Sequence, residues 1–304
     1  MLASGNNTAI TTRRLAALPR PLAFVFPGGG ALGSYQVGVL KALAAAAIEP
    51  DLLIGVSAGA MNASLFAWNN GKDGITRIDE IWRTLKRRDL LRFQPARLAL
   101  AFTGYRPSFI DNRHGEQFLR RHFGYRRIEE SPTPLAVVAT NLTNGMAVAL
   151  TDGDAATAIL ASTAFPGVYP PIHRDGMTLI DGGVVADIPL DIAVQLGARS
   201  ALIISVPVLK PSTPPRKAID ILIRASTFGV EAHGRTTLQR PPPELTVVEI
   251  PAPPSPITTF AVGRSGSAID DAFRETTAWL ASEYFEVAPG SIPDQDGTTV
   301  SVDV

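Results

Sequence analysis

The residues best suited to chemistry are a serine and an aspartate, each placed where an apolar run meets a glycine-rich turn. Ser57 lies in Gly55-Val56-Ser57-Ala58-Gly59, at the end of the apolar run 52–56. A strand that ends on a serine and turns at once into a helix strains the backbone and exposes the serine oxygen beside the helix N-terminus. This pattern predicts a nucleophile; a glycine-rich turn with an incidental serine is the alternative.

A serine hydroxyl needs a base to take its proton, and the usual base is a histidine. None of the four histidines ends an expected strand: His114, His122, His173 and His233. Asp181 does end one, 177–180, and Gly182 and Gly183 after it let the backbone turn tightly. Burial there would raise the pKa of the carboxyl group and strengthen it as a base. The pattern therefore favours a Ser57–Asp181 dyad.

A third glycine-rich turn, Gly28-Gly29-Gly30-Ala31-Leu32-Gly33, follows the apolar run 22–26. Gly28-x-Gly30-x-x-Gly33 matches the dinucleotide fingerprint, which also requires an acidic residue at the end of the next strand. Asp51 precedes that strand instead. The other use of such a loop is to direct backbone N–H groups at a developing oxyanion. We expect Gly28, Gly29 and Gly30 to supply these donors.

The elements that must position these motifs follow from the periodicity. Strand, glycine loop, helix, strand and helix succeed one another over residues 22–68, which predicts a right-handed βαβ unit of a parallel sheet. Further strands are expected at 134–140, 146–151, 177–180, 201–207 and 245–250, and further helices at 155–164, 189–197, 218–239 and 267–285. We expect one α/β domain, 20–288, after a flexible lead-in, 1–19, and before a polar tail, 289–304.

The composition excludes several functional classes. The 304 residues have a formal net charge of zero, which gives no indication of a nucleic-acid partner. The chain has no cysteine and no His-x-x-x-His or Glu-x-x-His pair, so we expect no disulfide, no metal and no cofactor. No secretory signal is visible, and the uncharged stretch 52–71 contains too many glycines and asparagines for a membrane span. We expect a cytoplasmic protein.

The charge is uneven along the chain. Residues 83–127, here called the basic segment, hold twelve Lys or Arg residues against three acidic ones, interleaved with large apolar side chains. One interpretation is a set of solvated helical faces. The other is a cap over the active site that makes peripheral contact with anionic head groups or an anionic membrane surface.

The three motifs occur in the order and context of the patatin-like phospholipases, which the chain resembles over roughly residues 20–208. The stretches 161–172 and 182–189 are similar to that family's segments around its aspartate. The resemblance implies a three-layer α/β/α fold with a mostly parallel sheet. It also implies a lipid acyl hydrolase that works through an acyl-enzyme, with Ser57 as nucleophile, Asp181 as base and Gly28–Gly30 as oxyanion donors. The remaining motif glycines match as well: Gly33, Gly55, Gly59, Gly182 and Gly183.

Two positions depart from the family pattern. Many members carry a basic residue where Leu32 stands, which puts one auxiliary contact near the oxyanion loop in doubt. Asn is frequent where Asp187 stands, and either residue can cap a helix. Two rival functions remain open at this point. The same Ser57 could serve an acyltransferase or thioesterase, or the fold could be kept in a catalytically inactive membrane-binding adaptor.

Overall fold

The structure, a computed structural model, describes residues 10–69, 72–90, 103, 105–208, 214–215, 218–253 and 262–282. Within these residues the centre is an eight-stranded sheet with the order β5-β6-β3-β2-β1-β7-β8, and β4 pairs with β3 outside this path. The strands are β1 Leu22–Phe26, β2 Leu52–Val56, β3 Leu135–Asn141, β4 Met146–Leu150, β5 Ile172–Arg174, β6 Met177–Asp181, β7 Ser200–Ile203 and β8 Thr246–Glu249.

The sheet is parallel in its centre and antiparallel at one end. Strands β3, β2, β1, β7 and β8 run parallel, whereas β4, β5 and β6 pair antiparallel with their neighbours. Every residue of β1 and β2 is buried, as expected for strands covered on both faces, and this explains their uninterrupted apolar sequences. Because the strands are parallel, the loops after β1 and β2 leave the same edge of the sheet.

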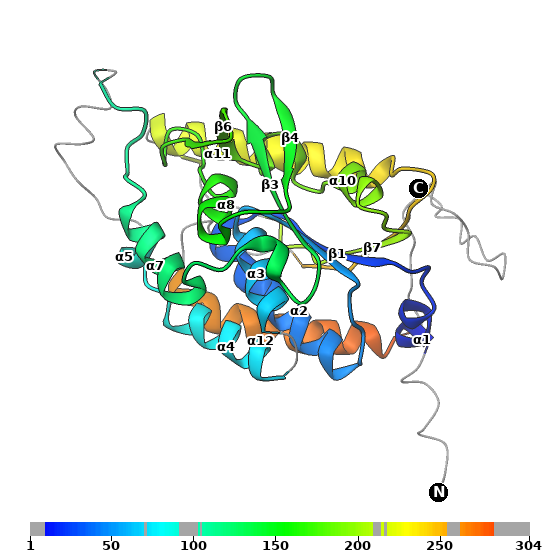
Figure 1. Ribbon diagram of the computed structural model, residues 1–304. Coiled ribbons are helices and arrows are strands. Elements are labelled where there is room, and N and C mark those ends of the chain that lie inside the picture. The colour runs from blue at the N-terminus through cyan, green and yellow to red at the C-terminus, as the bar shows by residue number, and fades with distance from the viewer. Residues whose placement is uncertain are drawn as a thin grey trace, which may run out of the picture.

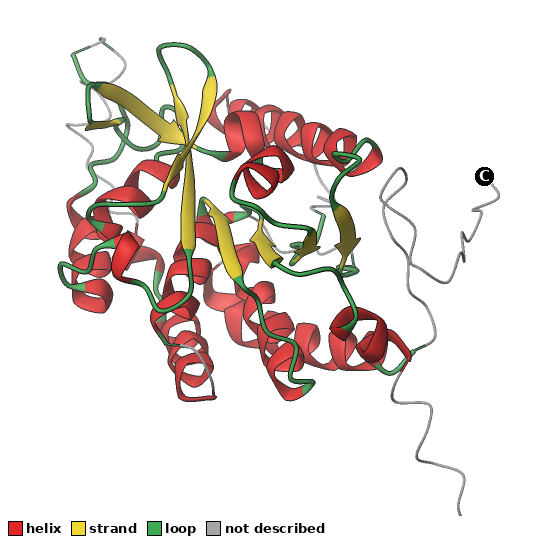
Figure 2. Cartoon of the chain, turned by 45° about the vertical axis from the view of Figure 1, so that its right-hand side comes forward, coloured by secondary structure: helices red, strands yellow, loops and turns green. Residues whose placement is uncertain are grey.

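Helices cover both faces of the sheet (Figures 1 and 2). One layer contains α2 Gly33–Ala45, α3 Ala58–Trp68, α4 Lys72–Thr84 and α12 Ser265–Leu280, and the other contains α10 Leu190–Gln195 and α11 Ala218–Gln239. Phe24 and Leu53 belong to the core under the first layer, and Val25 and Ile54 to the core under the second. Successive strand residues point to opposite faces, so one strand serves both cores. The expected three-layer α/β/α fold with a mostly parallel sheet is confirmed.

Shorter elements complete the described chain. They are the helices α1 Ile10–Ala16, α5 Arg87–Leu90, α7 Arg113–Phe123, α8 Ala155–Ser162 and α9 Gly183–Ala186, and the 3-10 turns η2 Gly30–Leu32, η3 Ile128–Glu130 and η4 Val262–Arg264. The stretch 52–69 forms β2 and α3 as the sequence predicts. No helix in the described ranges has the length and apolar content needed to cross a membrane.

The expected flexible lead-in is wrong for its second half. Residues 10–16 form α1, and Leu15 and Leu18 are buried. The hydroxyl of Thr11 donates to the carbonyl oxygen of Ser282, 2.7 Å away, just beyond the end of α12. The Thr12 hydroxyl also donates to the Leu280 carbonyl, 3.3 Å away. Apolar side chains and hydrogen bonds thus dock a segment whose sequence shows no long periodicity. Residues 1–9 and the expected tail 289–304 lie outside the described residues.

The basic segment is partly built into the fold. It is described at 83–90, 103 and 105–127. Several of its apolar side chains are buried in the larger core, namely Leu85, Phe118, Leu119 and Phe123. Three of its arginines form ion pairs with acidic residues: Arg83 with Asp79 and Asp270, Arg120 with Asp154, and Arg127 with Glu129. Part of the segment therefore packs into the fold, and the choice between solvated helical faces and a cap that contacts a membrane stays a prediction.

The close contact between α2 and α12 generates a prediction about stability. A Cβ added to Gly38 would lie 2.2 Å from the carbonyl oxygen of Ile269 and 2.5 Å from the Cβ of Ala272. Gly38→Ala should therefore destabilise the protein by about 1–3 kcal/mol, the usual cost of overpacking. Gly229→Ala in α11 is the matched control, since nothing lies within 4 Å of its added Cβ. Thermal and urea denaturation should show a loss at Gly38 and none at Gly229; equal effects would contradict the proposed close packing.

Candidate active site

Ser57 occupies a strained corner between β2 and α3. Its φ of 53° is in the left-handed region, which residues other than glycine rarely adopt. A Cβ on Gly55 would lie 2.5 Å from the Cα of Ala60, and a Cβ on Gly59 would lie 2.1 Å from the carbonyl oxygen of Phe26. Both motif glycines are thus required by the close passage of α3 over β2 and β1. Because α3 begins at Ala58, its first N–H groups, which have no intrahelical acceptor, lie beside the serine.

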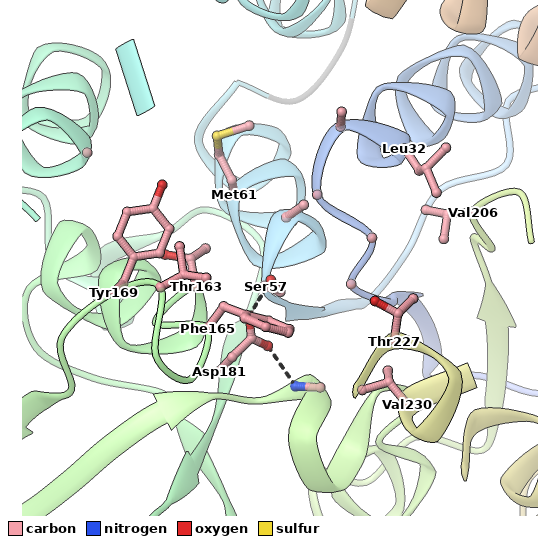
Figure 3. A pocket seen from close by; sticks show the side chains of 18 of the residues that line it. Leu32, Ser57, Met61, Thr163, Phe165, Tyr169, Asp181, Val206, Thr227 and Val230 are labelled. Atoms are coloured by element: carbon pink, nitrogen blue, oxygen red, sulfur yellow. Dashed lines mark hydrogen bonds between the residues drawn. The ribbon is translucent and has the colours of Figure 1, made fainter. Parts of the chain in front are cut away.

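The side chain of Ser57 points at Asp181 (Figure 3). Its Oγ donates a hydrogen bond to Asp181 Oδ2 at 2.7 Å, and the backbone N–H of Gly183 donates to Asp181 Oδ1 at 2.9 Å. Asp181 is only 5% exposed. Burial raises the pKa of Asp181 to about 6, while the hydrogen bonds from Ser57 and Gly183 oppose that rise. The carboxyl group is therefore a stronger base than a solvated aspartate and is ionised at neutral pH.

Gly182 and Ser162 fix the backbone on the two sides of the Ser57–Asp181 pair. A Cβ on Gly182 would lie 2.2 Å from the carbonyl oxygen of Val138 in β3, so the turn after β6 fits against β3 only as glycine. Ser162, at the end of α8, accepts the Ser57 N–H at 2.8 Å and donates to the Val138 carbonyl at 2.6 Å. Ser162 thus fixes the backbone of the nucleophile corner. In the sequence, Ser162 lies within the stretch 161–172 that resembles a family segment, and no pattern indicates a role for it.

The glycine loop after β1 differs from the expected donor set. The N–H of Gly28 donates to Asp187 Oδ1 at 2.8 Å and is not available to an oxyanion. Gly29 and Gly30 have φ values of 153° and 58°. Within the described chain, their N–H groups meet no acceptor. A Cβ on Gly33, at the start of α2, would lie 3.1 Å from the Cβ of Ala58.

A buried polar network links this loop to the helix that carries Ser57. Asn62 of α3 donates to the Gly33 carbonyl and to the side chain of Gln36, each at 2.8 Å. Gln36 donates to the Pro27 carbonyl at 2.9 Å, and Trp82 of α4 donates to Asn62 at 2.7 Å. Because buried polar groups are costly to leave unpaired, this network favours a single arrangement of loop and nucleophile. Nothing in the sequence motifs identified Asn62 or Gln36.

Ser57 and Asp181 open into a cavity of about 470 Å³. Most of its wall is apolar and comes from both halves of the chain, including Leu32, Met61, Trp82, Phe118, Ile159 and Val206. Phe165 and Tyr169 border it near the dyad, and Leu32, Val206 and Val230 lie on the side of the glycine loop (Figure 3). Arg87 and Phe118 of the basic segment also contribute to the wall. Such a lining suits an apolar chain attached to a polar reacting group.

Asp187 is not the helix cap that the sequence suggested. The residue before α10 is Pro189, and no side chain caps that helix. Asp187 instead follows α9, lines the cavity and accepts the Gly28 N–H. The expectation failed because the contact joins residues 159 positions apart.

A histidine base and a dinucleotide site find no support in the described residues. None of the four histidines, all of which are described, lines the cavity. The ring of His173 instead lies 3.2 Å from the hydroxyl of Thr178. Asp51, the acidic residue nearest to the dinucleotide pattern, accepts the Leu22 N–H at 2.6 Å at the start of β1, the end opposite the glycine loop.

Comparisons with known proteins agree with this geometry. The model of the patatin-like phospholipase family matches residues 24–194, more than half of the chain and inclusive of all three motifs. The chain is 30% identical over 191 residues to patatin-like phospholipase domain-containing protein 7 of Rattus norvegicus, an alignment that covers 61% of this chain. It is 29% identical over 210 residues, 66% of this chain, to lysophospholipase nte1 of Aspergillus niger.

The chain corresponds to only a part of these relatives, because each alignment covers 13% of the relative's length. Among solved structures, VipD from Legionella pneumophila superposes with a TM-score of 0.46 and 13% identity, over 86% of this chain and 67% of VipD. The family match spans the nucleophile corner, the aspartate turn and the glycine loop. By sequence, the chain is a member of the patatin-like phospholipase family.

Proposed function

We propose that this protein is a serine lipid acyl hydrolase, an esterase or phospholipase of the A type, that works through an acyl-enzyme. The observation that carries the proposal is the 2.7 Å hydrogen bond from Ser57 to the buried Asp181 at the base of an apolar cavity. A hydroxyl paired with a base is the minimum for nucleophilic catalysis, and the cavity wall suits an acyl chain. Family membership supports the same reaction class.

The reaction follows from the positions of these groups. As Ser57 Oγ attacks the ester carbonyl carbon, Asp181 takes its proton and the carbonyl oxygen becomes an oxyanion. Gly29 and Gly30 then donate their backbone N–H groups to this oxygen. Collapse of the intermediate breaks the bond to the alcohol, which leaves with the proton from Asp181. The same carboxylate removes a proton from water, which attacks the acyl-enzyme. The bond to Ser57 Oγ then breaks, Asp181 returns the proton to Ser57, and the fatty acid is released.

The basic segment supplies the proposed contact with an anionic membrane surface. Six of its arginines are exposed and form no ion pair within the described chain: Arg87, Arg88, Arg106, Arg113, Arg121 and Arg126. Arg87 also lines the cavity, so the charged surface adjoins the entrance for substrate. Of the segment's described large apolar residues, Leu85, Phe118 and Phe123 are buried in the core, whereas Tyr105 and Tyr125 are exposed. The docking in this proposal therefore combines arginine charge with these two exposed aromatic side chains.

The dyad is tested by two substitutions. Ser57→Ala and Asp181→Asn should each lower the turnover of a short nitrophenyl ester by several orders of magnitude, because they remove the nucleophile and its base. A fluorophosphonate should add one adduct to the wild type, at Ser57 by mass spectrometry. His173→Ala and His233→Ala are the controls and should keep wild-type turnover. Histidine variants as inactive as Ser57→Ala would contradict the dyad. A separate assay adds an acceptor alcohol to the wild type, and efficient transfer of the acyl group to that alcohol would indicate a transferase.

The pKa of Asp181 predicts the acid side of the pH profile. The dyad is active only when Asp181 is ionised, and burial raises the pKa of this carboxyl to about 6. Turnover should therefore rise about tenfold per pH unit below that value and approach its maximum between about pH 6 and pH 7. Steady-state rates between pH 4.5 and 7, at constant ionic strength, measure this limb. A midpoint near that of a solvated aspartate, about pH 4, would contradict the buried base.

Membrane docking is tested with Arg87/Arg88/Arg113→Gln. Each arginine near an anionic bilayer contributes on the order of 1 kcal/mol, so the triple variant should lose most of its binding to phosphatidylglycerol vesicles. The control is Arg199/Arg240/Arg264→Gln, which removes the same charge from exposed positions outside the basic segment. Co-sedimentation at low and high salt gives the readout, because salt screens the attraction. Equal binding by both variants, or binding insensitive to salt, would leave the segment as a solvated surface.

A further inference from the structure

A second carboxyl group lies at the oxyanion loop. Asp187 Oδ1 accepts the Gly28 N–H at 2.8 Å. A Cβ placed on Gly28 would lie 3.0 Å from this oxygen and 3.2 Å from the Cβ of Ser57. The carboxyl group of Asp187 therefore contacts the first residue of the loop at the point where the loop passes the nucleophile.

Asp187 and Asp181 are carried by the same short turn. Asp181 ends β6, α9 covers Gly183–Ala186, and Asp187 follows it directly. A Cβ on Gly183 would lie 3.3 Å from the Oδ1 atoms of both aspartates, so the two carboxyl groups flank one glycine. Asp181 accepts from the Ser57 hydroxyl, and Asp187 accepts from the Gly28 N–H of the oxyanion loop. The turn that carries both aspartates therefore couples the position of the base to that of the oxyanion loop.

The hydrogen bond from Gly28 sets the direction of the donors that follow it. Gly29 and Gly30 adopt φ values of 153° and 58°. Because glycine has no Cβ, a loop built from such residues could adopt many other arrangements as well. Val206 restrains Gly29 on one side, where an added Cβ would lie 2.9 Å from its methyl group. Asp187 restrains the preceding residue through the backbone. With both restraints, the N–H groups of Gly29 and Gly30 have a fixed position from which to meet an acyl oxyanion.

The charge of the Asp187 carboxyl group affects an oxyanion bound at the glycine loop, because this group lies beside the loop. A carboxylate beside the oxyanion loop repels the negative charge that develops during acyl transfer, whereas a protonated carboxyl keeps a carbonyl oxygen to accept the Gly28 N–H. Asp181 and Glu231 of α11 face it, and His233 and Arg235 of the same helix are exposed. Strands β3 and β4, which pack against α9, contain no charged residue. Removal from water raises the pKa of Asp187 to about 7; repulsion from Asp181 and Glu231 adds to this rise, and the hydrogen bond from Gly28 opposes it.

Resting on the proposed hydrolase function, we propose that Asp187 is a positioning residue for the oxyanion loop and that its protonated, uncharged form is the active one. The acceptor oxygen holds Gly28 in either state, and the proton removes a repulsive charge from the hole. The side chain of Asn would meet both requirements at every pH, since its amide oxygen accepts the same N–H and carries no charge.

The first test separates acceptor from charge with Asp187→Asn and Asp187→Ala. At pH 6, Asp187→Asn should keep kcat within about threefold of wild type, because the acceptor remains. Asp187→Ala should lower kcat by about ten- to a hundredfold with KM changed less than threefold, since misplacing oxyanion donors affects the transition state more than substrate binding. Thermal denaturation of each variant checks the fold. A folded Asp187→Ala protein with wild-type kcat would overturn the positioning role.

The second test is the pH profile between 6 and 9, with a nitrophenyl ester followed at the isosbestic wavelength and Ser57→Ala rates subtracted. Wild-type kcat should fall above about pH 7, the pKa of Asp187, and Asp187→Asn should hold a plateau. Glu231→Gln should move the falling limb to lower pH, because it removes a charge that raises the pKa of Asp187. An Asp187→Asn profile that falls as the wild type does would overturn the role of the proton, even if Asp187→Ala does not fold.

The two proposals fail in different ways. A wild type with no turnover and no phosphonate adduct at Ser57 rejects the hydrolase function. An active, labelled wild type whose Asp187 variants match it in kcat and pH profile rejects the role of Asp187 alone.

Discussion

The hydrogen bond from Ser57 to Asp181 joins two residues 124 positions apart, and most of the structure around it serves to make that contact at 2.7 Å. The serine must leave β2 in a strained conformation, and the aspartate must end β6 beside the same edge of the sheet. Neither condition is met by local sequence preference. Strands β2 and β6 both pair with β3, which therefore sets the separation between nucleophile and base.

Close approach of backbones makes this arrangement possible. Gly55, Gly59 and Gly182 each stand where a Cβ would lie 2.5 Å or less from a neighbouring main-chain atom. Such contacts let α3 and the aspartate turn pack directly on the strands, with no side chain between them. The strain at Ser57 is opposed by the Ser162 hydroxyl, which accepts its N–H, and by the burial of α3. Strained conformations of this kind persist only where the surroundings determine them.

The cavity brings apolar side chains and carboxyl groups together. Its wall is mostly apolar, yet Asp181, Asp187 and Glu231 all border it. Low polarity makes carboxyl groups retain protons, so the same wall that we propose to accommodate an acyl chain also raises the pKa of Asp181 and Asp187. Substrate binding and base strength thus have a common physical origin in this fold.

The sequence by itself predicted the central elements of the sheet and the candidate nucleophile and base. Continuous apolar runs gave β1 and β2, and the glycine patterns marked Ser57, Asp181 and the oxyanion loop, because these features depend on neighbours in the chain. The tertiary structure decided what those groups contact. The acceptor of the Gly28 N–H, the Ser162 support of Ser57 and the burial of Phe118 each join segments distant in sequence. Composition and spacing do not predict such contacts. The contacts form only when strands from separate parts of the chain pair and bring their ends to one edge of the sheet.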